Sequence, residues 1–199
     1  MNPWRGIRTC ALRAWRCAPR ATALALALLT AAAALGAAPA EAERALERRV
    51  KAAFLFRFTE FVSWPGPAFG RPDAPFVIAV ASHDGLAEEL RQITSGRTVQ
   101  GRAVEVRRVR EPETLQAAQM VFVADSERPR LREWVRAAPR HTLIVTESAG
   151  ALAAGSVINF VIVEGRVRFE ISLESAEKRG LRMSSRLLAV AQDVKTGAP

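Results

Sequence analysis

Short apolar runs that alternate with helix-forming segments constrain the fold of this chain more than any other feature. Residues 76–82, 120–124 and 142–146 are almost wholly apolar, and a fourth strand is expected at 104–109. Runs of this length and composition are typical of strands buried on both faces of a parallel sheet. The sequence therefore predicts a single α/β domain with a mostly parallel sheet flanked by helices.

The chain is expected to close this sheet with a C-terminal antiparallel hairpin. Residues 159–163 and 166–171 alternate in polarity on either side of Glu164-Gly165, which suits a two-residue turn. Two short helices should follow. Ser172 can cap the first, which Gly180 would close, and Ser184 can cap the second.

Apolar residues at three- and four-residue spacing predict a first helix over residues 44–62. Two prolines and a glycine directly after Trp64 should stop it. Further helices are expected at 86–93, 111–118 and 129–137, the last with Asp125 or Ser126 as its cap.

The first forty residues have the pattern of a secretory signal peptide. Five arginines precede an apolar run over 21–35, and Ala38-Pro39-Ala40 forms a small-residue cleavage site before Glu41. The alternative is a transmembrane anchor, but the run is shorter than the roughly 20 residues that a spanning helix needs. We expect a signal peptide at 1–40, one domain at 41–199, and a soluble protein in the periplasm.

Removal of this segment changes the charge and the cysteine content. The whole chain has 29 Lys+Arg and 20 Asp+Glu, a net charge of +9, and the signal removes five arginines and no acid. The remaining +4 is a poor argument for nucleic-acid binding. Cys10 and Cys17 both lie in the signal, so the mature chain can form neither a disulfide nor a cysteine-ligated metal site.

Signals for an enzyme are weak, and no cofactor is expected. His83 and His141 lack metal-ligand spacing. Ser82-His83-Asp84 are too close in sequence to form a catalytic triad. Gly150 and Gly155 have the spacing of a phosphate-binding loop, but Ser156 stands where its lysine would be needed.

The sequence favours binding over catalysis, and several residues are candidates for a binding site. The loops at His83 and Asp125 should follow strands at the carboxyl edge of the sheet, where open α/β sheets bind ligands, although ordinary turn chemistry also explains them. Phe58 and Trp64 could contact a partner or pack in the core.

Charged and polar residues near the C-terminus supply the remaining candidates. Arg168 and Glu170 share one face of a strand, while Phe169 and Ile171 should face the core. Ser184, Ser185 and Arg186 open the last helix, where they could cap it or hold an acidic group.

Several motifs carry a family resemblance. They are KAAFLFRFTEFVSWP at 51–65, the apolar strand at 120–123, GSVINF at 155–160, VRFEISL at 167–173 and GLRMSSRLL at 180–188. In this order and spacing, the chain resembles the YfiR/HmsC-like family of periplasmic proteins. Departures are Ser172 where relatives commonly have Asn, Ser156 where they often have a second glycine, and a mature chain without the cysteines that form disulfides in some members.

The resemblance implies a non-enzymatic regulator. Such a protein would bind the periplasmic sensor domain of an inner-membrane signalling protein, here a diguanylate cyclase, and lower cyclic-di-GMP and biofilm formation. An outer-membrane lipoprotein would be a further partner. The sequence leaves the oligomeric state open, and a homodimer is one possibility. The resemblance also supports Arg168 and Glu170 as site residues, because the family motif retains both charges. The alternative is a periplasmic small-ligand sensor coupled to another receptor or kinase.

Overall fold

A computed structural model describes residues 19–197 of the chain, with side chains from residue 40 onward. The signal peptide expected at 1–40 therefore lies outside the described residues, apart from the helical backbone of 19–39 and Ala40. The chain consists of two compact units, and the boundary between them lies between Ala45 and Leu46. Among the residues that the structure describes, no helix is long and apolar enough to cross a membrane.

The helices follow the sequence predictions more closely in the two C-terminal segments than in the middle. Five are α-helices: α1 Pro19–Phe61, α2 Asp84–Thr94, α3 Leu131–Ala137, α4 Leu173–Lys178 and α5 Ser185–Ala189. Four are 3₁₀ turns: η1 Gly66–Ala68, η2 Pro112–Thr114, η3 Asp125–Arg130 and η4 Ala151–Ala154.

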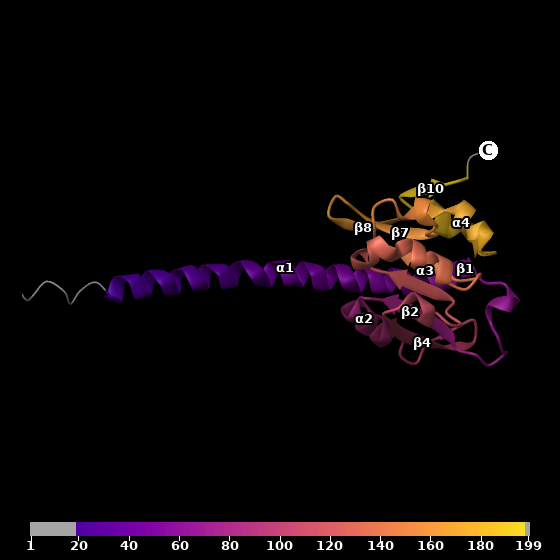
Figure 1. Ribbon diagram of the computed structural model, residues 1–199, viewed down its shortest axis with the longest axis horizontal. Coiled ribbons are helices and arrows are strands. Elements are labelled where there is room, and N and C mark those ends of the chain that lie inside the picture. Colours follow the sequence, from indigo (N-terminus) through magenta and orange to yellow (C-terminus); the bar gives the residue numbers. More distant parts are fainter. Residues whose placement is uncertain (1–18, 198–199) are drawn as a thin grey trace, which may run out of the picture. The chain divides into compact units, whose positions relative to one another are not determined.

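The strands form one large sheet and one small pair (Figure 1). The large sheet has the order β10-β8-β7-β6-β5-β2-β4-β3, and its strands are β2 Phe76–Ala81, β3 Thr98–Val99, β4 Arg102–Val109, β5 Met120–Val123, β6 Leu143–Thr146, β7 Ile158–Val163, β8 Arg166–Ser172 and β10 Asp193–Lys195. The small pair joins β1 Val62–Ser63 to β9 Arg182–Met183.

The expected fold class is confirmed. Neighbouring strands from β4 to β7 are parallel, and β7 and β8 form the antiparallel hairpin. Its turn has Glu164 at φ 51° and Gly165 at φ 70°, which is the left-handed conformation that a two-residue hairpin turn requires. The sequence did not reveal β10, a three-residue strand that pairs in parallel with β8 at the sheet edge.

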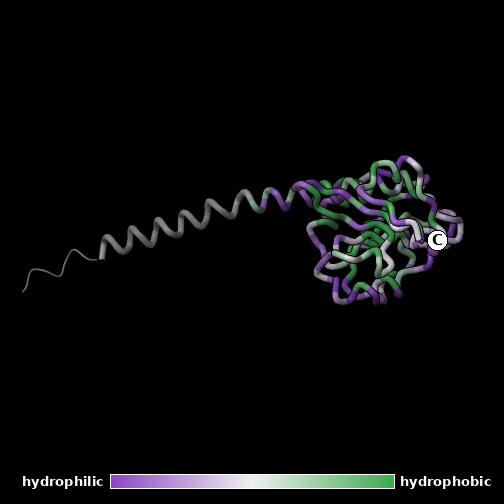
Figure 2. The backbone as a smooth tube through the Cα atoms, turned by 90° about the horizontal axis from the view of Figure 1, so that it is seen from above, coloured by the Kyte–Doolittle hydropathy of each residue, from purple (hydrophilic) through white to green (hydrophobic). Residues whose placement is uncertain are grey.

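Alternation along the strands divides the core into two faces. Phe76, Ile78 and Val80 of β2 point to the first face, which α1 and α2 cover. Val77 and Ala79 point to the second face, where Trp134 of α3 is fully buried. Figure 2 shows hydrophobic strands running through the middle of the unit that begins at Leu46, with hydrophilic turns around them.

Two helix predictions were wrong in detail. The segment 111–118 forms only the short turn η2 and then reverses at Ala117, where φ is 54°, so that Leu115 and Ala118 can be buried. The helix expected at 129–137 begins at Leu131, because Pro129 lies inside the 3₁₀ turn η3. Its cap position is Arg130 rather than Asp125 or Ser126.

Candidate functional site

The hairpin presents Arg168 and Glu170 on the second face of the sheet, as predicted. Phe169 and Ile171, with relative exposures of 2% and 0%, point to the first face. The Phe169 ring lies 5.1 Å from the Phe58 ring and 5.5 Å from the Phe54 ring between centroids. This aromatic packing fixes the strand, so the charged side chains between these residues must point the other way.

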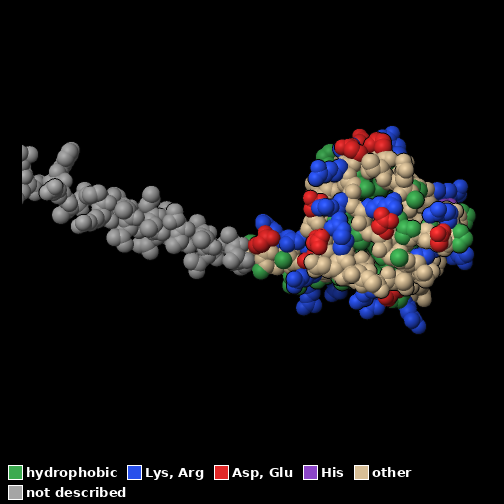
Figure 3. Space-filling model, turned by 90° about the horizontal axis from the view of Figure 1, so that it is seen from below, with side chains coloured by type: hydrophobic (Ala, Val, Ile, Leu, Met, Phe, Trp, Pro, Cys, Tyr) green, Lys and Arg blue, Asp and Glu red, His purple; other side chains and the backbone are tan. Residues whose placement is uncertain are grey.

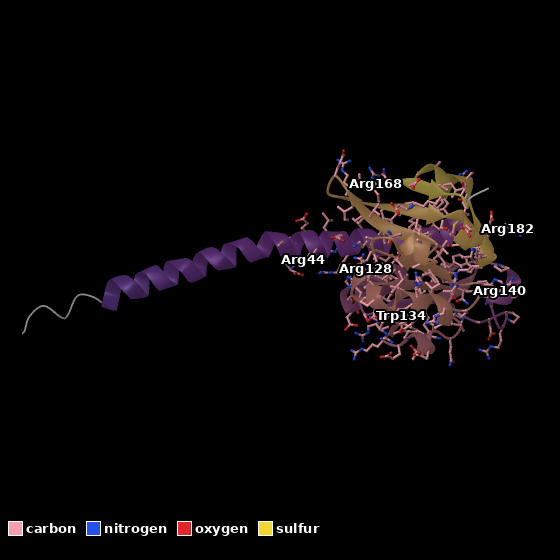
Figure 4. The ribbon with its side chains drawn as sticks, turned by 45° about the horizontal axis from the view of Figure 1, so that its top comes forward. Arg44, Arg128, Trp134, Arg140, Arg168 and Arg182 are labelled. Atoms are coloured by element: carbon pink, nitrogen blue, oxygen red, sulfur yellow. The ribbon has the colours of Figure 1, made fainter. Side chains whose placement is uncertain are left out.

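Within the described residues, the buried hydrophobic cluster on the second face does not extend to this end of the sheet. The buried second-face cluster is built from β2, β4, β5, β6 and the segments around α3 and η4, and among the described residues it includes none from β7, β8 or β10. Arg168 is exposed and Glu170 is half-buried. Figure 4 shows Arg168 well separated from Arg140 and Arg182.

The charges on this face are not neutralised within the domain. Within residues 40–197, neither Arg168 nor Glu170 makes a side-chain hydrogen bond or ion pair. Glu170 lies beside Asp193 in the register of β8 and β10, which places two like charges on adjacent strands. Like charges at such positions are destabilising unless a cation lies between them. The hairpin face is therefore suited to a partner that supplies complementary charges.

The other aromatic candidates are core residues in this structure. Phe58 is 1% exposed, and Trp64 is 7% exposed. The Trp64 ring packs edge-on against Phe76 at 4.9 Å, and its Nε1 donates to the Gln119 carbonyl at 2.9 Å. Both residues therefore pack in the core, which is one of the two placements that the sequence left open. Neither side chain is accessible to a partner.

The third group of candidates lies beside the end of α1. The Ser184 N–H donates to the Phe61 carbonyl, and the Ser184 side chain caps α5 by accepting from the Leu187 N–H at 3.2 Å. Ser185 and Arg186 are exposed on the first turn of α5. The seven candidates thus fall into three places: the hairpin face, the core and the start of α5.

A buried ion-pair cluster at the carboxyl edge of the sheet was missed by the sequence analysis. Lys51 of α1, 7% exposed, donates to Glu47 one helical turn away and to Glu147 Oε2 at 2.6 Å. Glu147 Oε1 accepts from the Asp125 N–H at 3.1 Å. Burial disfavours the charged lysine, but its hydrogen bonds to Glu147 and Glu47 outweigh this and raise its pKa above the usual 10.5.

This cluster lines a pocket of about 440 Å³ together with Asn159 and Phe160. The strand order β4-β2-β5-β6-β7 is the doubly wound order 2-1-3-4-5, in which ligands bind at the carboxyl edge near the β2/β5 reversal. The helical spacing of Glu47 and Lys51 was visible in the sequence. Glu147, however, is 96 residues from Lys51, and no local pattern joins them.

The glycine loop between β6 and β7 does not form a phosphate cradle. Gly150 and Gly155 both have positive φ and bracket η4. The Gly155 and Ser156 N–H groups donate to the carbonyls of Leu152 and Ala151, so they are not free for a ligand. Among the described residues, no group of three His, Cys, Asp or Glu side chains could hold a metal ion.

The model of one protein family, described as YfiR/HmsC-like, matches residues 48–192. This range begins within α1, extends past the end of α5 and contains all seven candidate residues. The chain belongs to the YfiR/HmsC-like family. Membership supports the general role of a periplasmic, non-enzymatic regulator that interacts with a membrane signalling protein.

At two positions where this chain departs from the family motifs, the residue present fits its surroundings. Ser172 caps α4 by accepting from the Ser175 N–H at 3.2 Å, as the expected Asn would. Ser156 is fully buried, and its hydroxyl lies 2.9 Å from Thr146 Oγ1 and 2.8 Å from the Ile158 carbonyl oxygen. Ser156 does not have the positive φ that would favour glycine, so a second glycine is not required here.

Several solved structures match this chain at low sequence identity. A conserved domain protein from Vibrio cholerae is 13% identical over 60% of this chain and 54% of its own, with a TM-score of 0.45. An ABC domain in complex with L-Trp from Streptococcus pneumonia is 12% identical over 60% and 55%, also with a TM-score of 0.45. The chain spans about half the length of these solved proteins. No curated protein matches it.

His83 caps a helix at the carboxyl edge of the sheet. Its Nδ1 caps α2 by accepting from the Leu86 N–H at 3.2 Å, which requires an unprotonated Nδ1. Burial lowers the pKa of His83 below the usual 6.5; the Glu147 charge opposes this shift, and the cations Lys51 and Arg48 add to it.

We therefore expect acid to destabilise the domain through His83. Because the pKa of His83 is lower in the folded protein than in the unfolded chain, the contribution of His83 to stability is complete above pH 6.5. This contribution is lost as the pH falls below that value, since the unfolded chain then binds a proton more readily than the folded protein does. The melting temperature should fall from about pH 7.5 to about pH 5.5. The variant His83→Asn keeps a side-chain acceptor for the cap but does not titrate in this range, so its melting temperature should fall less. Equal falls would contradict this role.

Proposed function

We propose that this protein is a periplasmic regulator that binds the sensor domain of an inner-membrane diguanylate cyclase and represses it. The observation that carries the proposal is the family match, which covers residues 48–192 and thus nearly the whole folded unit. The uncovered hairpin face supports it, because Arg168 and Glu170 are held on a rigid strand and have no partner among the described residues.

Repression in this proposal works by contact rather than by chemistry. A partner segment with complementary charges would neutralise Arg168, Glu170 and the adjacent Asp193. Lower cyclase output would reduce cyclic-di-GMP and, through it, biofilm formation. An outer-membrane lipoprotein that competes for the regulator would release the cyclase. The mixed charge distribution favours a protein partner over nucleic acid, since the face in Figure 3 shows acidic and basic side chains interspersed.

A small-ligand sensor is the second candidate function. The pocket of about 440 Å³ at the carboxyl edge favours it, since the buried Lys51 and Asn159 and the half-buried Glu147 place polar groups beside the apolar Phe160. A ligand there would alter the contact between α1 and the loop after β6. In this version the membrane partner would be another receptor or kinase.

Copurification tests the proposed contact. The protein, tagged at its C-terminus, is crosslinked in intact cells and recovered from solubilised membranes. We expect an inner-membrane protein with a cytoplasmic signalling domain in the wild-type sample and much less of it with Glu170→Ala. Equal recovery with both proteins would count against the hairpin face. Recovery of no inner-membrane protein would count against the regulatory contact itself.

Export is part of this proposal, and it predicts a defined mature N-terminus. Cleavage after Ala38-Pro39-Ala40 should release a protein that begins at Glu41 and retains the family-matched residues 48–192. N-terminal sequencing of the protein from the periplasmic fraction measures this. A mature chain that keeps the apolar residues 21–35 would instead indicate a membrane anchor.

A further inference from the structure

A second pocket, of about 470 Å³, lies at the amino edge of the sheet, at the opposite ends of the parallel strands from the Lys51 cluster. The end of α3, η4 with the following Gly155, and one side of α4 from its cap Ser172 to Arg179 form its walls. We call it the amino-edge pocket and define it by Arg136, Arg140, Ser172, Ser175, Lys178 and Arg179. Arg168 and Glu170 do not line this pocket, although Ser172 ends the same strand on the same side.

The amino-edge pocket has a large excess of positive charge. Its lining includes the cations Arg136, Arg140, Lys178 and Arg179 and one carboxylate, Glu174. That carboxylate already pairs with Lys178 on the surface of α4. Among the described side chains, the three arginines make no ion pair. Three neighbouring cations are therefore without a counter-charge.

Arg179 is the one of these cations whose guanidinium bonds to two other segments of the described domain. Its two terminal nitrogens donate to the Val135 carbonyl at 2.9 Å and to the Pro139 carbonyl at 3.1 Å. Its own carbonyl oxygen lies 2.8 Å from His141 Nδ1. Burial lowers the pKa of Arg179, and no acidic side chain compensates for the loss of solvent. The guanidinium is thus fixed in place before any ligand arrives.

An alternative is that water alone solvates these arginines. Some arginines elsewhere on the domain are paired, such as Arg57 with Glu60 at 2.8 Å. Others form no ion pair within the described residues, as Arg168 shows, so it is their grouping that distinguishes the arginines of this pocket. Convergence of three unpaired arginines on one hollow, one of them half-buried, is different from scattered surface charge. A concave site also excludes part of the water that would screen the cations.

We propose that the amino-edge pocket binds a phosphate group. Guanidinium groups donate in planar pairs that match phosphate oxygens, and a phosphate, as a dianionic monoester or a monoanionic diester, offers three unpaired cations more acceptor oxygens in that geometry than a single carboxylate does. The hydroxyls of Ser172 and Ser175, 3.1 Å apart, lie in the same lining and can contribute polar contacts. The phosphate could belong to a soluble phosphate ester or to a phospholipid headgroup. This site is independent of the proposed regulatory contact.

The test removes two exposed cations that hold no structural contacts to other segments. Arg136 and Arg140 are both exposed, and the Arg136 side chain bonds only to the Arg132 carbonyl of its own helix. Arg136→Gln/Arg140→Gln should therefore fold normally. The matched control is Arg110→Gln/Arg128→Gln, which makes the same charge change at exposed positions on the other edge.

Calorimetric titration with inorganic phosphate at constant ionic strength should show saturable binding to the wild type. The pocket variant should lose at least about tenfold in affinity, while the control should stay within about twofold. Cosedimentation with phosphatidylglycerol and phosphatidylcholine vesicles tests the lipid source. Binding of phosphatidylglycerol alone, lost in the pocket variant, would support a headgroup site. No saturable binding to either probe, or equal losses in both variants, would overturn the proposal.

Discussion

Replacing Lys51 by methionine should destabilise the domain by about 3–5 kcal/mol, the loss expected when one member of a buried ion pair is removed. Lys51 and Glu147 have side-chain exposures of only 9% and 14%, so the substitution would leave the Glu147 carboxylate buried without its cation. Chemical denaturation of the purified domain measures the free energy of unfolding.

The chain offers a matched control for this prediction. Glu174 and Lys178 form a pair with the same four-residue helical spacing as Glu47 and Lys51, but both side chains are more than half exposed. Lys178→Met should therefore change stability by no more than about 0.5 kcal/mol. Adding Glu147→Gln to Lys51→Met should restore part of the loss, because it removes the uncompensated charge. Equal effects at Lys51 and Lys178 would contradict the importance of burial.

Substitution of the hairpin charges should impair regulation without unfolding the protein. Glu170→Ala and Arg168→Ala are each expected to weaken partner binding by about 2–5 kcal/mol, or roughly thirtyfold or more in affinity. Stability should change little, since neither side chain bonds within the described domain and Phe169 and Ile171 supply the core packing. Cyclic-di-GMP should rise at unchanged periplasmic protein level.

The exposed pair Glu88 and Arg91 on α2 provides the control, because each charge contacts its neighbour on the helix surface. Glu88→Ala and Arg91→Ala should repress normally. Full repression by both hairpin variants would remove Arg168 and Glu170 from the site. Disappearance of the variant proteins would assign these residues to folding instead.

The sequence predicted those parts of the fold that depend on local patterns. Apolar runs gave the central strands within one or two residues, as at β2 and β6. The hairpin and the caps at Ser172 and Ser184 were predicted correctly because turn and cap chemistry acts over two to four residues. The charged face of β8 followed from strand alternation alone.

Features that depend on tertiary contacts could not be predicted in this way. Helical periodicity placed Phe58 on one face of α1, but it could not show whether that face met the core or a partner. The segment 111–118 has helix-forming residues, yet burial of Leu115 and Ala118 requires an irregular path. Both pockets combine side chains from segments far apart in the chain, as Lys51 with Glu147 and Arg136 with Arg179.

Cyclic-di-GMP in a strain that lacks this protein tests the central claim most directly. The measurement compares the deletion strain, the same strain complemented with the full-length wild-type gene, and a complemented strain in which residues 2–40 have been removed. A repressor that acts from the periplasm predicts raised cyclic-di-GMP in the deletion strain, restoration by the full-length gene, and no restoration by the unexported form. Cyclic-di-GMP that is unchanged by the deletion, or equally restored by the unexported form, would contradict the account.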